Sequence, residues 1–510
     1  MKKIFGDKNY KDYIPKPICE DYPEYNELYL KAWELAFDHV KDIPGMIQNP
    51  YMDEALCKTQ VWIWDSCFMS LFCKYARNVF PGVETLNNFY GVLHENKKLA
   101  TVIPDESEPK WTLATPGVPY EVVLNIADNP PLFAWAEYEN ALFGGDIEYL
   151  KELLYERKIL QKHYEWFESL KEQILFVGVL NETCLIAKKD GYAWEGGRSG
   201  MDNTPRGRTG ESAERERPNN PDLLWLDAIC QQAMSANIIA KMFALLKDFE
   251  NEKIWLEKYN DKKEIINNLY WDELDKFYYD INDKTKEFVK VPTIASFWPM
   301  TAEVASDIQA RHLEGHFADE KTFGGIVPFP SLSRSDNDFK DDGRYWRGGV
   351  WLPTAYASLK GLKNYKMFDT AYESSLKLLN HMYLTYKEYE PHTIWECYSP
   401  TKCEPATVPD GSRKSRPNFC GWSALGPISV YIEFVLGFHT VDAFGKIVEW
   451  EKSDQLTKKT GIQNLAFGDI ITDIITEGNK CSVKSNGRYT LKINGVEYNI
   501  EKGINEFEII

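Results

Sequence analysis

The sequence has no apolar run long enough to cross a membrane, which takes about 18 or more residues. Its first residues, MKKIFGDKNYKDYIPKP, include lysines but lack the apolar core of a secretory signal peptide. We therefore expect a cytoplasmic protein that has neither a signal peptide nor a membrane-spanning helix.

The cysteines and histidines lack the spacing of metal ligands. The 10 cysteines are scattered and none forms a C-x-x-C pair, which favours reduced thiols over disulfides or zinc ligands. His312 and His316 are one helical turn apart, but they stand in HLEGH rather than H-E-x-x-H, and no third ligand is evident. Residues 277–291 read as a hairpin and lack the central Gly and distal Glu of a calcium loop. We expect no metal and no other cofactor.

Nucleotide and nucleophile motifs are missing as well. The chain contains no G-x-G-x-x-G, no Walker A sequence and no G-x-S-x-G, so nucleotide cofactors and serine hydrolase chemistry have no support. Basic residues are outnumbered, with 59 Lys and Arg against 77 Asp and Glu and a net charge of −18. This excess of negative charge opposes nucleic acids and anionic membranes as partners.

Aromatic residues, by contrast, are abundant: they make up 14% of the chain and include 16 Trp. The apolar content of 44% and the charged content of 27% are those of a soluble globular protein. Most of the rings belong in the core, but flat rings beside polar loops also suit the apolar faces of sugars. The composition is therefore compatible with a small carbohydrate ligand.

The chain reads as helical up to about residue 440, because apolar residues recur at spacings of three and four. Eleven such helices are predicted, with room for a twelfth. Twelve helices can pair as six antiparallel hairpins in an (α/α)6 barrel, although a solenoid or a large bundle is also compatible with the pattern. The helices are predicted at 23–40, 65–80, 83–96, 131–143, 147–170, 221–246, 252–271, 300–317, 351–362, 367–389 and 422–437.

The texture changes at about residue 441. Short β-branched segments follow, and Asn486-Gly487 and Asn494-Gly495 are typical of tight hairpins. We expect a small antiparallel β domain at 441–510 behind a helical domain at 1–440. A structural cap is its simplest role and carbohydrate binding the alternative, with Trp450 as its only tryptophan.

Two acidic motifs lie in the long loops between the helices. One is SGMDNTP around Asp202, and the other is WECYSP around Glu396. Each motif places one carboxylate among Gly, Pro, Ser and aromatic residues. Glycosidic bond hydrolysis needs such a pair, since one carboxyl group protonates the leaving oxygen while the other activates a water. From the residues alone, Asp202 could equally form an Asx-turn, and Glu396 could be a surface residue at a helix start.

These motifs resemble those of glycoside hydrolase family 63 and its trehalase-like relatives, the six-hairpin glycosidases that include mannosylglycerate hydrolase. SGMDNTP resembles the family's SG-x-D-N-x-P, and WECYSP its E-x-Y segment. Three further stretches agree in order: TQVWIWDSCF (59–68), NPPLFAWA (129–136) with Asn where Gln is usual, and RYWRGGVWLP (344–353). Glu195 lies further from the SG-x-D core than the family's E-S-G does, which indicates a local insertion.

The resemblance implies an (α/α)6 barrel and an inverting, exo-acting glycoside hydrolase that cleaves a small α-linked glucoside or mannoside. Asp202 would be the general acid and Glu396 the general base, with Glu404 as the nearest rival. The implied substrate-binding residues are Trp64, Asp65, Trp111, Asn129, Trp346, Arg347, Trp351, Trp395, Tyr398 and Trp422. Asp65 could instead be a helix N-cap, and Arg347 could stack structurally on tryptophan.

Arginines gather around the two acidic loops and raise the question of the leaving group. They could meet an anionic group such as a carboxylate or phosphate, or they could be solvated or paired with nearby Glu. They are Arg198, Arg206, Arg208 and Arg413. The leaving group could thus be a sugar or a glycerate.

Two other functions remain open from the sequence. A sugar epimerase, lyase or phosphorylase on the same barrel is one, although none of the 8 histidines falls in the acidic motifs. A non-catalytic sugar-binding protein is the other, and the presence of both carboxylates argues against it.

Overall fold

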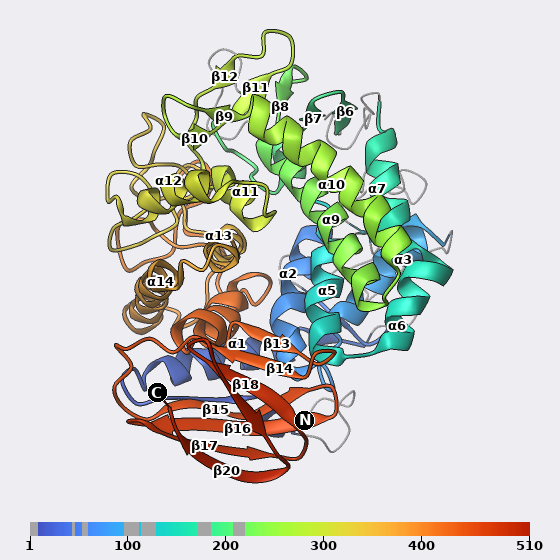
Figure 1. Cartoon of the computed structure of the whole chain (residues 1–510). Helices are drawn as coiled ribbons and strands as arrows, with labels where there is room; N and C mark the ends of the chain where they lie inside the picture. The colour runs from blue at the N-terminus through green and yellow to red at the C-terminus, as the bar shows by residue number, and fades with distance from the viewer. Residues whose placement is uncertain are drawn as a thin grey trace.

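The computed structural model describes residues 9–42, 46–53, 60–95, 112–113, 129–171, 185–207 and 220–509. These residues form a ring of helices that stands on a β-rich part, and both ends of the chain lie at this β-rich part (Figure 1).

Six helical segments form the inner layer of the ring. Each contacts the next, and the last contacts the first, so the layer closes on itself. In chain order they are α2 (Ile63–Cys73), α5 (Phe133–Gly144), α9 (Leu226–Leu245), α11 (Trp298–Thr301), α13 (Leu352–Asn364) and the π-helix η8 (Gly426–Val435).

The outer layer covers these segments (Figure 1). Composition explains the division: α9 is buried along nearly its whole length, whereas α10 buries only Trp255, Tyr259 and Ile266 and presents Lys and Glu to solvent. The outer helices are α1 (Tyr25–Asp38), α3 (Asn87–Leu93), α6 (Ile147–Lys151), α7 (Ile159–Ser169), α10 (Phe249–Leu269), α12 (Asp307–Ala318) and α14 (Phe368–Glu388).

The predicted helices are largely confirmed, but four differ in physically informative ways. The helix predicted at 300–317 is two helices, because α11 ends at Thr301 and α12 begins at Asp307 after the N-cap Ser306. The helix predicted at 147–170 breaks at Lys158, whose φ of 55° is left-handed, into α6 with the π-helix Glu152–Arg157 and then α7. The helix predicted from residue 65 begins at Ile63 after the N-cap Trp62, so the N-cap alternative for Asp65 is wrong. The helix predicted at 422–437 is a 3-10 turn at Ser423–Leu425 followed by η8.

The β-rich part consists of two packed sheets. Cross-sheet contacts join them: the rings of Phe467 and Tyr489 lie 5.5 Å apart, and Thr472 and Tyr489 share a hydrogen bond of 2.9 Å. One sheet has the order β1 (Lys16–Cys19), β15 (Thr460–Phe467), β16 (Ile470–Glu477), β17 (Lys480–Ser485) and β20 (Gly503–Glu508). The other has the order β13 (Thr440–Asp442), β14 (Ile447–Trp450), β18 (Tyr489–Ile493) and β19 (Val496–Ile500).

Three details differ from the predicted antiparallel domain. The strand β1 comes from the N-terminal part of the chain and pairs with β15, so the two ends of the sequence share one sheet. The pair β14–β18 is parallel. Asn494-Gly495 forms the predicted tight turn with positive φ at both residues, but Asn486-Gly487 joins β17 to β18 in the other sheet and is not a hairpin turn.

The region 277–291 also departs in part from the predicted hairpin. The strands β11 (Asp280–Asn282) and β12 (Phe288–Val289) pair as expected, whereas β10 (Phe277–Tyr278) pairs with β9 (Trp271–Asp272). The strand β8 (Leu223–Leu224) lies on the other edge of β11.

A buried ionic network ties inner helices together. Lys74 bonds Glu139 (2.8 Å) and Glu433 (3.0 Å), and Lys360 bonds the same two carboxylates (2.8 and 3.3 Å). Burial alone would raise the pKa of Glu433, but the charges of Lys360 and Lys74 outweigh it and lower the pKa. The network lies toward the carboxyl ends of these helices, away from the ends where the acidic motifs lie.

Glu137 is a buried carboxylate that should make stability depend on pH. Tyr90 and Tyr149 donate hydrogen bonds of 2.9 and 3.0 Å to it, but burial, with the charge of Glu84, raises its pKa to about 7 despite these bonds and Arg157. A folded-state pKa above the unfolded value stabilises the fold at low pH, and this stability is lost as pH rises from about 4.5 to about 7. Between pH 5 and 7.5 the free energy of unfolding should fall by about 2 kcal/mol through this group.

The variant Glu137→Gln tests this. Its free energy of unfolding, measured in urea, should be lower than that of the wild type at pH 5. The difference between the two proteins should be smaller at pH 7.5, because only the wild type loses stability as the pH rises. If the difference between the two proteins does not change with pH, the assignment of Glu137 is wrong.

Candidate active site

The inner helices begin at one end of the ring, and most of the predicted motifs precede those beginnings. Consecutive inner helices are parallel because an outer helix returns the chain between them. As a result, Trp64 and Asp65 at the start of α2, Asn129 before α5 and Trp351 before α13 share this end with the loops of Asp202 and Glu396. We call it the motif rim.

Glu396 is held firmly within the motif rim. It is buried, and its Oε1 accepts hydrogen bonds from the Tyr345 hydroxyl (2.9 Å) and from Nη1 of Arg416 (2.9 Å). Its Oε2 accepts from the backbone amide of Arg416 (3.2 Å). Trp422 Nε1 (2.8 Å) and the Ser423 hydroxyl (3.1 Å) donate to its backbone carbonyl. Both the carboxylate and the peptide that carries it are thereby fixed.

Three carboxyl groups interact electrostatically at the motif rim. Burial raises the pKa of Glu396; Arg416 and the Tyr345 hydroxyl oppose this, and the charge of Asp202 adds to it. Burial also raises the pKa of Asp65 well above its usual value, with further contributions from the charges of Glu396 and Asp202. The structure therefore brings Asp65, Asp202 and Glu396 together from three separate segments of the sequence.

The loop that carries Asp202 is anchored on both sides. Before it, the Glu195 carboxylate caps the short helix α8 (Gly196–Ser199) by accepting from the amides of Gly197 (2.8 Å) and Arg198 (3.1 Å). Gly200 has a φ of +82°, and a Cβ there would lie 3.1 Å from the Trp64 ring. Both the backbone conformation and the close approach to Trp64 therefore favour glycine at this position. Glu195, whose role the sequence left open, thus shapes the chain that leads to Asp202.

Asn203 ties the same loop to the R-Y-W-R-G segment. Its Oδ1 accepts from the amide of Trp346 (2.9 Å), and its Nδ2 donates to the carbonyl of Arg344 (3.0 Å). Since Tyr345 lies between these two residues and bonds Glu396, one side chain links the loop of Asp202 to the contacts of Glu396.

Tyr345 and Arg416 are functional candidates that sequence reasoning missed. Tyr345 is adjacent to a motif tryptophan, which was its only signal. Its φ of 66° is strained for a residue with a side chain, and such strain is concentrated at functional sites. Arg416 carries no sequence signal, because the contact is created by the backbone pairing in which the Glu396 amide donates to the Arg416 carbonyl (2.9 Å).

Several predicted aromatic residues support the loops. Trp346 and Trp351 stack with centroids 4.2 Å apart at 5° and are buried, and Trp351 lies 5.6 Å from Trp422. Tyr398 is also buried, and its hydroxyl accepts from the amide of Trp395 (3.2 Å). A direct contact between these rings and a sugar stays a prediction.

Other predicted residues have buried polar atoms that a ligand could bond. Asp65 Oδ1, Asn129 Oδ1 and Trp395 Nε1 are buried and have no hydrogen-bond partner among the residues that the structure describes. Buried polar atoms of this kind are costly unless something bonds them, which fits sugar hydroxyls. Trp111 lies outside the described residues.

The loop arginines lie in different surroundings. Arg206 is paired with Asp227 and Asp280, so for this residue the structure favours the paired alternative over contact with an anionic ligand. Arg413 is exposed, Arg198 is buried and Arg208 lies outside the described residues. Arg347 is buried and its Nη1 bonds Asp338 (3.4 Å).

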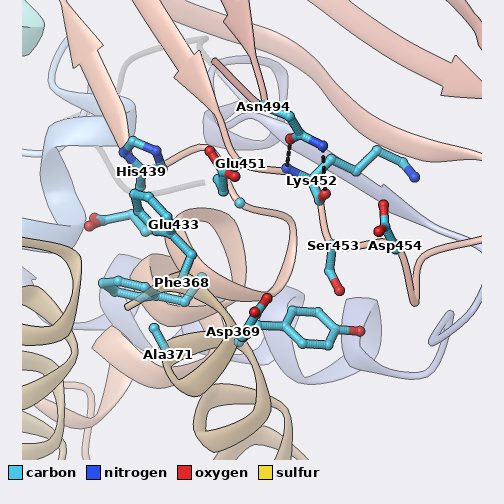
Figure 2. Close-up of a pocket in the computed structure, with 13 residues that line it drawn as sticks. Phe368, Asp369, Ala371, Glu433, His439, Glu451, Lys452, Ser453, Asp454 and Asn494 are labelled. Atoms are coloured by element: carbon cyan, nitrogen blue, oxygen red, sulfur yellow. Dashed lines mark hydrogen bonds between the residues drawn. The ribbon is translucent and has the colours of Figure 1, made fainter. Parts of the chain in front are cut away.

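A separate cavity of about 130 Å³ lies between α14, the end of η8 and the β-rich part (Figure 2). Its walls include Asp369, His439, Glu451 and Asn494, and the last exchanges hydrogen bonds of 2.8 and 3.2 Å with the backbone of Lys452. None of the predicted site residues lines this cavity.

The described residues hold neither a metal-binding cluster of side chains nor a bilayer-spanning helix. Within those ranges, no group of three or more His, Cys, Asp or Glu side chains is arranged to hold a metal ion. His312 and His316 instead pack near the rings of Trp271 and Phe277. No helix in the part of the chain that is described is long and apolar enough to span a bilayer.

Carboxyl groups on separate loops meet at one end of this helical ring. Glycoside hydrolases use such a pair of carboxyl groups to cleave their substrates. A family model described as "Mannosylglycerate hydrolase MGH1-like glycoside hydrolase domain" matches residues 58–416, which is more than half of the chain. The chain belongs to this family of glycoside hydrolases.

Individual proteins are also similar to this chain. A protein of Borreliella burgdorferi is 26% identical over 427 residues, which cover 81% of this chain and 79% of that protein. The mannosyl-oligosaccharide glucosidase of Saccharomyces cerevisiae is 26% identical over 305 residues, covering 53% of this chain and only 34% of the glucosidase. The structure of the mannosylglycerate hydrolase from Thermus thermophilus, in complex with Tris and D-glycerate, has a TM-score of 0.53 at 17% identity, covering 79% of this chain and 99% of that one. This last likeness concerns the fold alone.

Proposed function

We propose that the chain is an inverting, exo-acting α-glycosidase that releases one monosaccharide from a small α-linked glucoside or mannoside, of the disaccharide or glycosyl-glycerate type. The observation that carries the proposal is the buried Glu396 carboxylate. Tyr345 and Arg416 bond it, and the charge of Asp202 raises its pKa. Two carboxyl groups with different surroundings are what acid–base cleavage of a glycoside requires.

The helical ring supports an (α/α)6 barrel. Six inner segments close on one another, and the outer helices pack against them, as six hairpins would. We retain a catalytic domain at 1–440 and a β domain at 441–510, with the strand Lys16–Cys19 contributed to the latter.

In the proposed reaction, Asp202 gives its proton to the glycosidic oxygen as the bond from that oxygen to the anomeric carbon breaks. Glu396 takes a proton from a water, which attacks the anomeric carbon from the opposite face. In this reaction Asp65, whose pKa the charges of both groups raise, accepts hydrogen bonds from the sugar hydroxyls. The product is a free sugar of inverted configuration.

The surroundings of Glu396 suit a base. Its role requires the ionised form. Burial disfavours this form and raises the pKa, while Arg416 and the Tyr345 hydroxyl oppose that rise. The charge of Arg416 also lowers the pKa of Asp65, but burial and the charges of Glu396 and Asp202 leave that pKa well above its usual value.

The relatives suggest which substrates to test. The Thermus hydrolase is a mannosylglycerate hydrolase and the yeast relative is a glucosidase. We therefore expect activity within a panel of α-linked disaccharides and glycosyl-glycerates in the gluco and manno series, assayed by release of the monosaccharide. Turnover that depends on inorganic phosphate would favour a phosphorylase, and an absence of turnover on the whole panel would contradict the proposal.

Replacement of Arg416 by Gln should shift the pH profile. Without the guanidinium, burial raises the pKa of Glu396 further, so the acidic limb of kcat/KM should move to higher pH by about one unit. Arg416 is partly exposed, which places the effect at the lower end of the usual range. The exposed Arg413 on the same loop provides the matched control, and Arg413→Gln should leave the profile in place. An unmoved acidic limb in Arg416→Gln would show that Glu396 is not the base.

A further inference from the structure

Arg206 forms a buried triad with two aspartates next to the loop of Asp202. Its Nη1 and Nη2 bond the two oxygens of Asp227 (2.8 Å each), and its Nε and Nη2 bond the two oxygens of Asp280 (2.7 and 2.6 Å). The guanidinium also lies over the Trp225 ring, 4.2 Å from its centroid. All three charged side chains are at least 96% buried.

The triad holds one cation between two anions, and the start of α9 balances the excess charge. The amide of Leu226 donates to Asp280 (2.9 Å) and the amide of Ala228 donates to Asp227 (3.2 Å). Both amides belong to the first turn of a 20-residue helix, whose positive end stabilises negative charge. The fork of Arg206 is therefore fixed to a helix and to the strand β11.

The triad lies close to Asp202 in the sequence. Only Asn203, Thr204 and Pro205 separate Asp202 from Arg206, and Asn203 is itself bonded at both ends of its amide. Nη1 of Arg206 also approaches Sδ of Met201, the residue before Asp202, at 3.6 Å. The backbone of Asp202 thus has fixed points on both sides.

Stability alone is a weak reason for such a triad. The attraction within a buried ion pair is largely offset by the free energy needed to remove its charges from water. Apolar residues can therefore often replace such a pair without loss of stability. A planar fork that bonds two carboxylates does, however, fix position and orientation closely. Proton transfer to a leaving group is sensitive to such placement, because an error of about 1 Å can cost about 10²-fold in rate.

We propose that Arg206, with Asp227 and Asp280, is a positioning residue for the general acid: it fixes the 201–206 turn so that the Asp202 carboxyl meets the glycosidic oxygen. The inference rests on the proposed function. It assigns to the triad an effect on protonation of the leaving group and none on activation of the attacking water.

The test compares two leaving groups on the same sugar. A methyl α-glycoside leaves as an alkoxide that needs the proton of Asp202, whereas an α-glycosyl fluoride loses fluoride without a proton. Both need the water that Glu396 activates. In Arg206→Lys, which keeps the charge and loses the fork, kcat/KM for the methyl glycoside should fall about 10- to 100-fold, and kcat/KM for the fluoride should fall less than about 3-fold.

Two further variants complete the design. Asp280→Asn keeps the acceptor for Leu226 and weakens the fork, so it should show the same selective loss. Arg157→Lys changes a partly buried arginine that bonds Glu95 and Asn87, and it should alter neither rate by more than about 2-fold.

The outcomes are distinct. Equal losses on both substrates, or failure of both triad variants to fold, would overturn the positioning role, since the triad would then support the fold as a whole. Unchanged rates on both substrates would overturn it as well, since the triad would then have no effect on Asp202. A wild-type protein that cleaves neither substrate in the gluco or manno series would overturn the proposed function, and this inference with it.

Discussion

Replacement of Glu396 by Gln is expected to lower kcat by about 10²- to 10⁴-fold, the usual contribution of a general base. The amide has nearly the same volume and keeps an acceptor for the Tyr345 hydroxyl and Arg416, so the loop should stay folded. It cannot take a proton from water. Steady-state kinetics on the best substrate of the panel measure the loss, and the melting temperature confirms that the fold is intact.

Glu404 supplies the matched control for this experiment. It lies on the same loop, is partly exposed and pairs with Lys414 at 3.1 Å. Glu404→Gln should keep nearly the full rate. If Glu404→Gln is the inactive variant, or if Glu396→Gln turns over at nearly the rate of the wild type, the base has been assigned to the wrong residue.

Replacement of Asp202 by Asn should have a loss of similar size, about 10²- to 10⁴-fold, through a different step. The amide cannot protonate the glycosidic oxygen, so the loss should be greatest for alkoxide leaving groups and small for a glycosyl fluoride. Binding of the product sugar should persist, as measured by calorimetry. Asp410→Asn, in the loop that follows Glu396, is the control and should leave the rate unchanged.

The pH profiles of the two variants distinguish acid from base. Loss of the acid should remove the basic limb of kcat/KM, and loss of the base should remove the acidic limb. If Asp202→Asn loses the acidic limb instead, the two roles are reversed.

The sequence predicted those features that depend on local pattern. Helical periodicity located nearly all of the helices, and Gly and Pro between them located the loops that carry Asp202 and Glu396. The expectation that these loops meet at one end follows from hairpin topology. It agrees with the structure, where the charge of Asp202 raises the pKa of both Asp65 and Glu396.

Features that depend on distant contacts were missed or wrong. Arg206 looks like a loop arginine in the sequence, and only the fold brings Asp227 and Asp280 to it. Arg416 reaches Glu396 through a backbone pairing that no motif records. Asn486-Gly487 has the composition of a hairpin turn, but the strands on either side belong to different sheets, so tertiary packing overrode a strong local signal.

The contribution of β1 was also beyond local reasoning. Lys16–Cys19 carries no sign that its partner, β15, starts more than 400 residues further along the chain. A strand is specified by the surface that it covers, and that surface forms only when the two ends of the chain meet.

The most direct test of the central claim follows the anomeric configuration of the fresh product by proton NMR. With an α-linked substrate, water that attacks the face opposite the leaving group produces the β-anomer first, and the α-anomer then grows in by mutarotation. The account predicts this order, with single monosaccharides as the only sugar released from the non-reducing end. An α-anomer at the earliest time points, or fragments released from the middle of a longer chain, would contradict it.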